Sequence, residues 1–168
     1  TGIELDESAH HTALENARRH QLDTRLQSIC ADLTTLSEFI APGSFSCCVS
    51  NPPYYTGGPA SQQTPLARRD DCCTLAELIA AAGKMLKFGG DFCLVHKPER
   101  LAELIARGSE LHLEAKRLLL LRHRIDGPIT LICLQFRKGG KPGLLWQEEA
   151  LFNTDSSPTA YYQTLYHL

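Results

Sequence analysis

The segment Phe45-Ser46-Cys47-Cys48-Val49-Ser50-Asn51-Pro52-Pro53-Tyr54 joins a short β-prone run to a polar, proline-rich and aromatic end. The apolar part predicts a strand, and the two prolines end it because they lack a backbone N–H group. Open α/β sheets bind ligands beyond the carboxyl ends of their strands. We therefore expect the Asn51 side chain and the Pro52 carbonyl to accept hydrogen bonds from a planar amine or amide, with the Tyr54 ring lying against it. The simpler alternative is a proline-rich turn.

Strand and helix patterns alternate along the rest of the chain. The expected strands are residues 2–6, 25–30, 45–50, 91–96, 115–122 and 129–136. The expected helices run from about Glu7 to His20, from Thr74 to the Gly89-Gly90 pair, and over a short segment from Pro98. Thr74 and Glu77 have the spacing of a capping box, and Asp126-Gly127-Pro128 between the last two strands predicts a hairpin. This order predicts a single α/β domain over residues 1–168, a doubly wound sheet ending in an antiparallel hairpin.

Three polar side chains lie at the carboxyl ends of three successive expected strands. They are Glu4, Asp32 and Asn51. Because the carboxyl ends of parallel strands meet at one edge of a sheet, we expect these side chains to surround one crevice. An acid in this position binds ribose hydroxyls in nucleotide-binding folds, which suits Glu4 better than Asp6, since Asp6 also suits the start of the next helix. Asp32 could accept from an adenine amino group while Leu33 covers the ring. A carboxylate that merely flanks a helix is the alternative for each acid.

The composition sets further limits on the class of protein. The chain has 168 residues, a net charge of −2 and seven cysteines. Vicinal cysteines without a Cys-x-x-Cys spacing argue against a zinc site and favour reduced thiols, so we expect no metal. No apolar run is long enough for a membrane span, and no secretion signal is present, which predicts a soluble, cytoplasmic protein. Between residues 61 and 138, Arg and Lys outnumber Asp and Glu, which is compatible with a phosphate-bearing partner or with an ordinary solvated surface.

The Asn-Pro-Pro-Tyr motif resembles that of class I S-adenosylmethionine-dependent amino methyltransferases, which act on adenine, guanine or glutamine amide nitrogens. The resemblance implies a Rossmann-like fold, an S-adenosylmethionine site that includes Glu4, Asp32, Leu33 and Asn51, and an acceptor site at Asn51, Pro52 and Tyr54. It also implies a first strand followed by a glycine-rich turn, and nothing upstream of Glu4 supplies them. The chain is therefore expected to be the C-terminal portion of the fold and to be inactive alone.

The flanking sequence is most similar to bacterial tRNA (valine) adenine-N6 methyltransferases. The similar segments are Ala67-Arg68 before a leucine-rich helix, Leu86 to Gly90, Val95 to Leu101, Lys138-Gly139-Gly140 and Leu151 to Tyr166. The resemblance implies methyl transfer to adenine N6 in tRNA, with Arg68 and Arg69 able to hold RNA phosphate. The same chemistry on a glutamine amide or on guanine N2 of ribosomal RNA is an alternative. A noncatalytic RNA-binding module is another.

Overall fold

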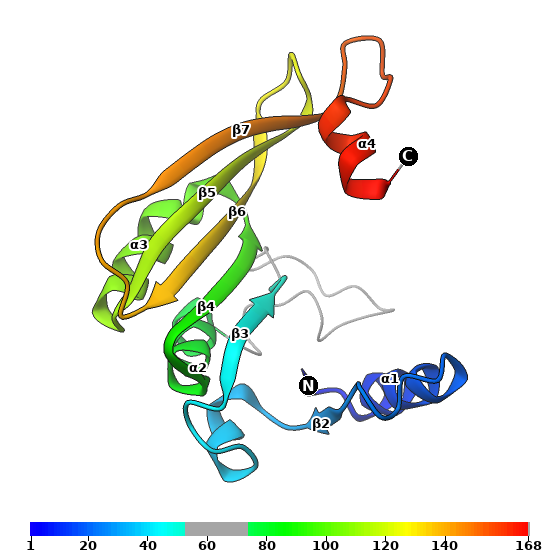
Figure 1. The fold of residues 1–168 in the computed structure, drawn as a ribbon, viewed down its shortest axis with the longest axis vertical. Helices are drawn as coiled ribbons and strands as arrows, with labels where there is room; N and C mark the ends of the chain where they lie inside the picture. The colour runs from blue at the N-terminus through cyan, green and yellow to red at the C-terminus, as the bar shows by residue number, and fades with distance from the viewer. Residues whose placement is uncertain (53–73, 168) are drawn as a thin grey trace.

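The computed structural model describes residues 1–52 and 74–167, which form two β-sheets and the helices around them (Figure 1). The elements in chain order are β1 (Gly2–Glu4), α1 (Glu7–Arg19), β2 (Ser28–Cys30), the 3₁₀ helix η1 (Leu33–Glu38), β3 (Phe45–Ser50), α2 (Leu75–Met85), β4 (Leu86–His96), the 3₁₀ helix η2 (Pro98–Arg100), α3 (Leu101–Glu110), β5 (Leu113–Arg124), β6 (Ile129–Lys138), β7 (Leu145–Phe152) and α4 (Ala160–Tyr166).

The larger sheet has the strand order β3-β4-β6-β5-β7. β6 runs antiparallel to β4 and β5, whereas β3 is parallel to β4 and β7 is parallel to β5. The carboxyl ends of β3, β4, β5 and β7 therefore lie at the same end of the sheet. The expected hairpin of β5 and β6 is confirmed. The sheet does not end there, however, because β7 adds a further parallel strand at the edge.

β1 and β2 form a separate, parallel two-stranded sheet. Within the described ranges no ladder joins either strand to β3. The link between the two sheets is η1, which buries Leu36 and holds α2 through a hydrogen bond from Lys84 Nζ to Ser37 Oγ of 2.8 Å. Within the described residues the β1–β2 pair and the larger sheet are thus two separate ladders.

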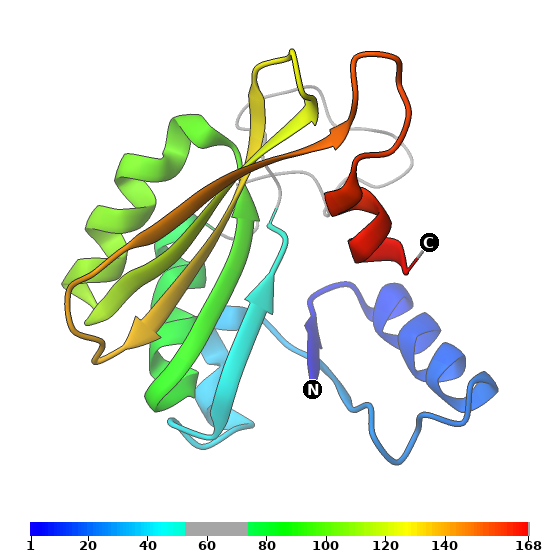
Figure 2. The same cartoon turned by 45° about the horizontal axis from the view of Figure 1, so that its top comes forward.

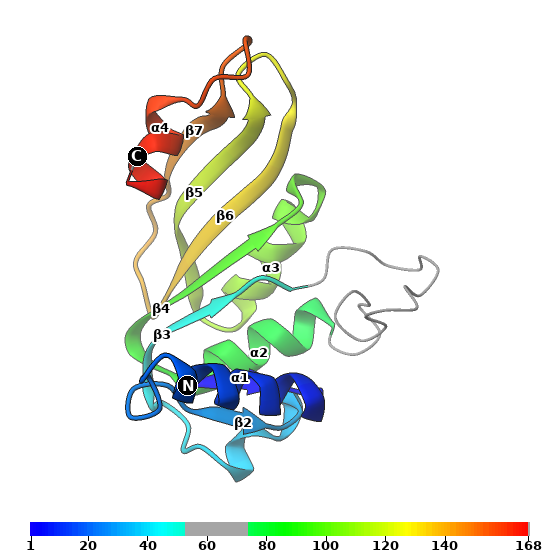
Figure 3. The same ribbon diagram turned by 90° about the vertical axis from the view of Figure 1, so that its right-hand side faces the viewer.

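The hydrophobic core lies between the larger sheet and the helices α2 and α3, which cover one of its faces (Figure 3). Ile79 of α2 and Leu104 of α3 are fully buried against Phe92 of β4 and Phe136 of β6. α2 begins with the expected capping box, in which Thr74 Oγ1 accepts from the Glu77 N–H at 3.2 Å and Glu77 Oε2 accepts from the Thr74 N–H at 2.8 Å. Burial of the helix faces thus fixes the position of the sheet.

The start of β4 differs from the sequence-based expectation. The helix ends at Met85, before the glycine pair, and Leu86 already has extended backbone angles (φ −73°, ψ 138°). Leu86 lies opposite Phe45 of β3 and is completely buried, so strand pairing overrides the helical periodicity. The glycines lie inside β4, and a Cβ on Gly90 would lie 3.1 Å from the Ser46 carbonyl oxygen. Glycine therefore allows β4 to approach the irregular start of β3 closely.

The second strand is shorter than expected. β2 contains only Ser28–Cys30, because Arg25 and Leu26 instead turn back and donate backbone hydrogen bonds to the Leu22 carbonyl at 2.9 and 2.7 Å. The prediction from residue type alone therefore overestimated the length of this strand. The helix before it, α1, ends one residue before the expected limit at His20.

Candidate active site

Asn51 and Pro52 directly follow β3, the strand that the sequence singled out. Ser50 lies opposite Leu94 of β4 in a parallel ladder, so the pairing carries the chain to the carboxyl end of the sheet just before Asn51. The Asn51 side chain is exposed and Pro52 is half-buried. Three other residues that were predicted to contribute to the site lie outside the described residues: Tyr54, Arg68 and Arg69. The described part of the motif thus places one amide side chain and one imide carbonyl at the carboxyl end of β3, an edge strand of the larger sheet.

Glu4 is the last residue of β1. Its Oε1 accepts the Asp6 N–H at 3.0 Å, and Asp6 in turn caps α1 by accepting the Ala9 N–H at 2.8 Å. Asp6 therefore has the helix-capping role that made it the weaker ribose candidate. Across the ladder Glu4 lies opposite Cys30, and its carbonyl accepts the Ala31 N–H at 3.0 Å. Glu4 and the residues after β2 are consequently close neighbours.

Asp32 has a structural role in addition to the one expected from its position. It is the N-cap of η1, where Oδ1 accepts both the backbone N–H and the Oγ1 hydroxyl of Thr34 at 2.7 Å. These two hydrogen bonds lower the pKa of the Asp32 carboxyl, so the carboxylate is ionised at neutral pH and can only accept. The Leu33 side chain is partly buried against the hydrophobic core. The alternative of a helix-flanking carboxylate therefore describes what Asp32 does in this structure.

The two carboxylates belong to adjacent strands, whereas Asn51 belongs to the other sheet. Glu4 ends β1 and Asp32 follows the end of β2, so both lie at the carboxyl edge of the small sheet. A pair of acceptor carboxylates at such an edge fits the hydroxyls of a ribose and the amino group of a nucleobase, both of which are hydrogen-bond donors. The residues present therefore fit the adenosine part of S-adenosylmethionine.

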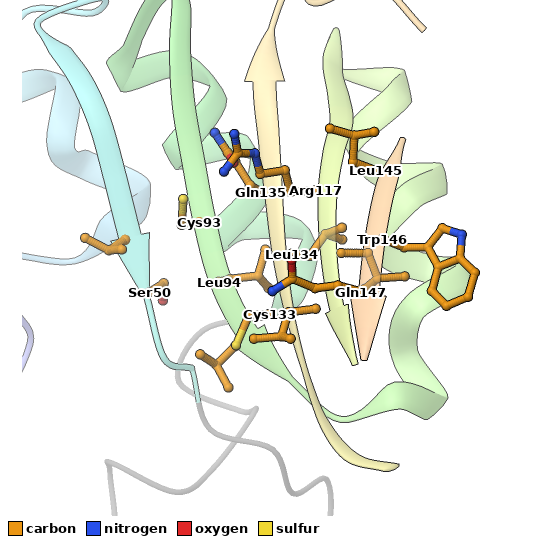
Figure 4. Close-up of a pocket in the computed structure, with 14 residues that line it drawn as sticks. Ser50, Cys93, Leu94, Arg117, Cys133, Leu134, Gln135, Leu145, Trp146 and Gln147 are labelled. Carbon is orange, nitrogen blue, oxygen red and sulfur yellow. The ribbon is translucent and has the colours of Figure 1, made fainter. Parts of the chain in front are cut away.

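A cavity of about 540 Å³ opens on the face of the larger sheet opposite α2 and α3 (Figure 4). Strands β3 to β7 line it, and Cys93, Cys133, Arg117 and Gln135 are among the lining residues. Burial raises the pKa of the Cys93 and Cys133 thiols, so both stay protonated. None of Glu4, Asp32 and Asn51 lines this cavity. This cavity was not predicted from the sequence, although alternate residues of β4 and β6 necessarily face away from the buried core.

Acids neutralise much of the basic stretch between residues 116 and 138. Arg137 contacts Asp91 at 2.8 Å, Arg122 contacts Glu148 at 2.8 Å, and Arg124 contacts Asp126 at 3.1 Å. The Arg137 guanidinium also lowers the pKa of Asp91. Three of the arginines that suggested a phosphate-binding surface are thus engaged within the protein.

The chain matches no protein-family model. It is 31% identical to a tRNA1(Val) (adenine(37)-N6)-methyltransferase from Bacteroides thetaiotaomicron, over 68% of this chain and 48% of the relative. The identity to the enzyme of the same name from Dickeya chrysanthemi is 28%, over 83% of this chain and 56% of that one. The chain is a homologue of these methyltransferases. It spans about half the length of the curated relatives that it matches.

The fold of this methyltransferase homologue agrees with the sequence relationship. A crystal structure from Agrobacterium tumefaciens, described as a predicted O-methyltransferase, superposes with a TM-score of 0.77 at 18% identity and covers 98% of this chain and 75% of that one. The Rossmann-like methyltransferase fold is thereby confirmed. In the part of the chain that the structure describes, no helix could span a membrane. Among the same residues no cluster of His, Cys, Asp or Glu could hold a metal ion.

Proposed function

We propose that the protein containing this chain transfers a methyl group from S-adenosylmethionine to the N6 amino nitrogen of an adenine in tRNA. The placement of Asn51 and Pro52 at the carboxyl end of β3 carries this proposal, because an acceptor held there would meet a nucleotide bound at the neighbouring strand ends. The homology to enzymes named as tRNA adenine-N6 methyltransferases supports the choice of acceptor. We also place the protein in the cytoplasm, where its tRNA substrate would be found.

The acceptor site works by positioning a weak nucleophile. The lone pair of an adenine amino group is delocalised into the ring. The Asn51 amide oxygen and the Pro52 carbonyl accept the two N–H hydrogens of that group, which favours a tetrahedral nitrogen and directs its lone pair toward the methyl donor. Positioning of this kind supplies a large part of the rate enhancement.

No strong base is required, because the nitrogen becomes acidic once it is methylated. His96, at the end of β4, is a histidine that could be considered as a base, but it is only 2% exposed and its Nδ1 accepts the Lys97 N–H at 2.8 Å. A ring so enclosed and oriented by the backbone is suited to a structural role at the end of β4 rather than to proton exchange with a substrate.

The carboxylates hold the adenosine end of the cofactor in this proposal. Glu4 would accept from the ribose hydroxyls and Asp32 from the adenine amino group, while Leu33 would cover one side of the ring. The bound cofactor supplies an electrophilic methyl group on a sulfonium sulfur. Tyr54 remains a prediction as the side chain that stacks on the target base, and Arg68 and Arg69 remain predictions as phosphate contacts.

The test uses the protein that contains this chain, with cofactor labelled in its methyl group and offered total tRNA or, separately, a release factor. Wild-type protein should label tRNA, and digestion of the product should yield N6-methyladenosine. Asn51→Ala should remove the label, at least a hundredfold in rate, with cofactor affinity nearly intact. Asn16→Ala, on the exposed surface of α1, is the matched control and should be fully active.

Each alternative has its own outcome in this assay. Label in the release factor and not in RNA would replace adenine by a glutamine amide. Methylated guanine in the RNA would change the base but keep the amino chemistry. Cofactor-independent RNA binding without any label would indicate a noncatalytic module.

A further inference from the structure

Four aromatic rings from three elements form a continuous row at one end of the larger sheet. His123 of β5 contacts Phe152 of β7, with ring centroids 5.1 Å apart, and Phe152 contacts Tyr162 of α4 at 5.1 Å. Tyr162 contacts Tyr166 at 4.5 Å. Phe152 and Tyr162 are half-buried, but His123 is exposed and Tyr166 is 60% exposed. The two ends of the row, which we call the aromatic row, therefore present ring surface to solvent.

The aromatic row is held rigidly. Thr159 caps α4 by accepting the Tyr162 N–H at 3.2 Å, and its hydroxyl donates to the Ala150 carbonyl of β7 at 2.6 Å. The connection between β7 and α4 is closed by a hydrogen bond from the Asn153 N–H to the Ser157 carbonyl at 2.8 Å. A surface fixed in advance loses little conformational entropy when a partner binds.

The aromatic row lies at the end of the sheet where the acceptor must enter. β3, β5 and β7 point in the same direction, so Asn51 after β3, His123 near the end of β5 and Phe152 at the end of β7 share that end. Figures 1 and 2 show α4 connected by a loop to the carboxyl end of β7, at this end of the larger sheet. A substrate that is bound at Asn51 and extends across this end of the sheet, from β3 toward β7, would reach these rings.

Charge around the aromatic row is largely compensated. Arg122 and Arg124, which flank His123, are paired with Glu148 and Asp126, and Arg124 also donates to the Thr154 carbonyl at 2.8 Å. Phosphate attraction is therefore a weak reason for a nucleic acid to bind here. Exposed aromatic faces bind unpaired bases by stacking, which tolerates any base. Salt dependence comes from contacts to phosphate, which stacking itself does not add.

We propose that the aromatic row is a stacking surface for unpaired nucleotides next to the acceptor adenine, with Tyr166 and His123 as its contacting rings. This proposal rests on the proposed function, because it assigns part of the RNA-binding surface of the same site. It makes loop nucleotides, whose bases are unstacked and accessible, the feature of RNA that the protein reads at this end. A double-stranded segment would not offer its base faces to these rings.

The experiment measures methyl transfer to an anticodon stem-loop RNA by the protein that contains this chain, varying RNA concentration. Tyr166→Ala should raise the KM for RNA about tenfold while kcat changes little, whereas Tyr166→Phe should stay within about twofold of wild type because stacking needs the ring alone. Leu165→Ala is the matched control, since Leu165 is the adjacent residue on α4 and is 50% exposed. A 2-aminopurine beside the target adenine should be quenched on binding by wild type and less by Tyr166→Ala.

Salt titration separates stacking from charge. Tyr166→Ala should bind RNA more weakly at every salt concentration with an unchanged salt slope. If Tyr166→Ala and Leu165→Ala have the same KM, the proposal fails. If Tyr166→Ala lowers the melting temperature, the KM for RNA is measured in His123→Ala in its place. An unchanged KM in His123→Ala would then refute the proposal. Wild-type protein that methylates no RNA would refute the proposed function itself, whereas normal RNA methylation by all variants would refute the stacking surface alone.

Discussion

Asp32 offers a test that separates helix capping from ligand binding, because its two carboxylate oxygens can be assigned different tasks. Oδ1 caps η1 through its hydrogen bonds from Thr34, and the proposed function has the carboxylate accept from the adenine amino group of the cofactor. Asp32→Ala removes both tasks. Asp32→Ser keeps a hydroxyl that can cap η1 but is too short to reach a ligand beyond the strand end.

The stability effect follows from the cap alone. Replacing an N-cap aspartate by alanine costs about 1 kcal/mol, and serine is nearly as good a cap as aspartate. Urea unfolding should therefore show Asp32→Ala about 1 kcal/mol less stable than wild type and Asp32→Ser within about 0.5 kcal/mol of it. Thr159→Ala, which removes the cap of α4 instead, serves as a control with a similar loss of stability.

The binding effect follows from the ligand contact. Loss of a hydrogen bond to a charged acceptor costs about 1.5 kcal/mol or more, which corresponds to roughly a tenfold higher Kd for S-adenosylmethionine. Calorimetry on the protein that contains this chain should show this loss equally in Asp32→Ala and Asp32→Ser, and no loss in Thr159→Ala. Unchanged affinity in Asp32→Ser would refute the ligand role and leave Asp32 as a helix cap.

Acid should weaken the same cap. Because the folded-state pKa of Asp32 is lowered by its bonds to Thr34, its stabilising contribution is complete above the ordinary aspartate value and is lost as pH falls below about 4. The difference in unfolding free energy between wild type and Asp32→Ala should therefore shrink below that pH. A difference that stayed constant down to pH 2.5 would show that charge contributes nothing to the cap.

Two further predictions concern the core and the cofactor. Gly108→Ala should destabilise the protein by about 1 kcal/mol or more in urea unfolding, since the new Cβ would lie 2.5 Å from Phe136 Cε1. Gly83→Ala should instead stabilise the protein by up to about 1 kcal/mol, because its Cβ would lie 3.6 Å from Leu113 Cδ1 and alanine favours a helix. Equal effects of the two substitutions would mean that helix propensity outweighs packing. Glu4→Ala should raise the Kd for S-adenosylmethionine at least about tenfold in calorimetry through lost ribose hydrogen bonds, and an unchanged value would remove Glu4 from the site.

Local signals in the sequence predicted the elements that depend on short-range physics. The capping box of Thr74 and Glu77, the hairpin around Asp126-Gly127-Pro128 and the helix-capping role of Asp6 are all set by residues a few positions apart. The strand before Asn51 was predicted for the same reason, because the two prolines that follow Asn51 lack the N–H groups that continue a ladder. The position of Asn51 at a sheet edge followed directly.

Features that depend on distant pairing were not predictable in this way. Leu86 completes the helical pattern of its neighbours, yet its pairing with Phe45 makes it the first residue of a strand. β7 was missed because its stability comes from pairing with β5 and not from an alternating sequence of its own. The aromatic row escaped sequence analysis too, since His123, Phe152 and Tyr162 are brought together only by the fold.

Glu4 and Asp32 lie on the small sheet and Asn51 on the larger one, and no ladder among the described residues joins the two sheets, so these two units can open independently. β1 and β2 are three residues long each, and a pair of strands this small is marginal without outside support, whereas β3 belongs to a five-stranded sheet with a buried core. Transient opening of the small unit would displace Glu4 and Asp32 while Asn51 stayed in place. A ligand that contacts both units binds only the closed population, so part of its binding free energy is spent on suppressing this local opening.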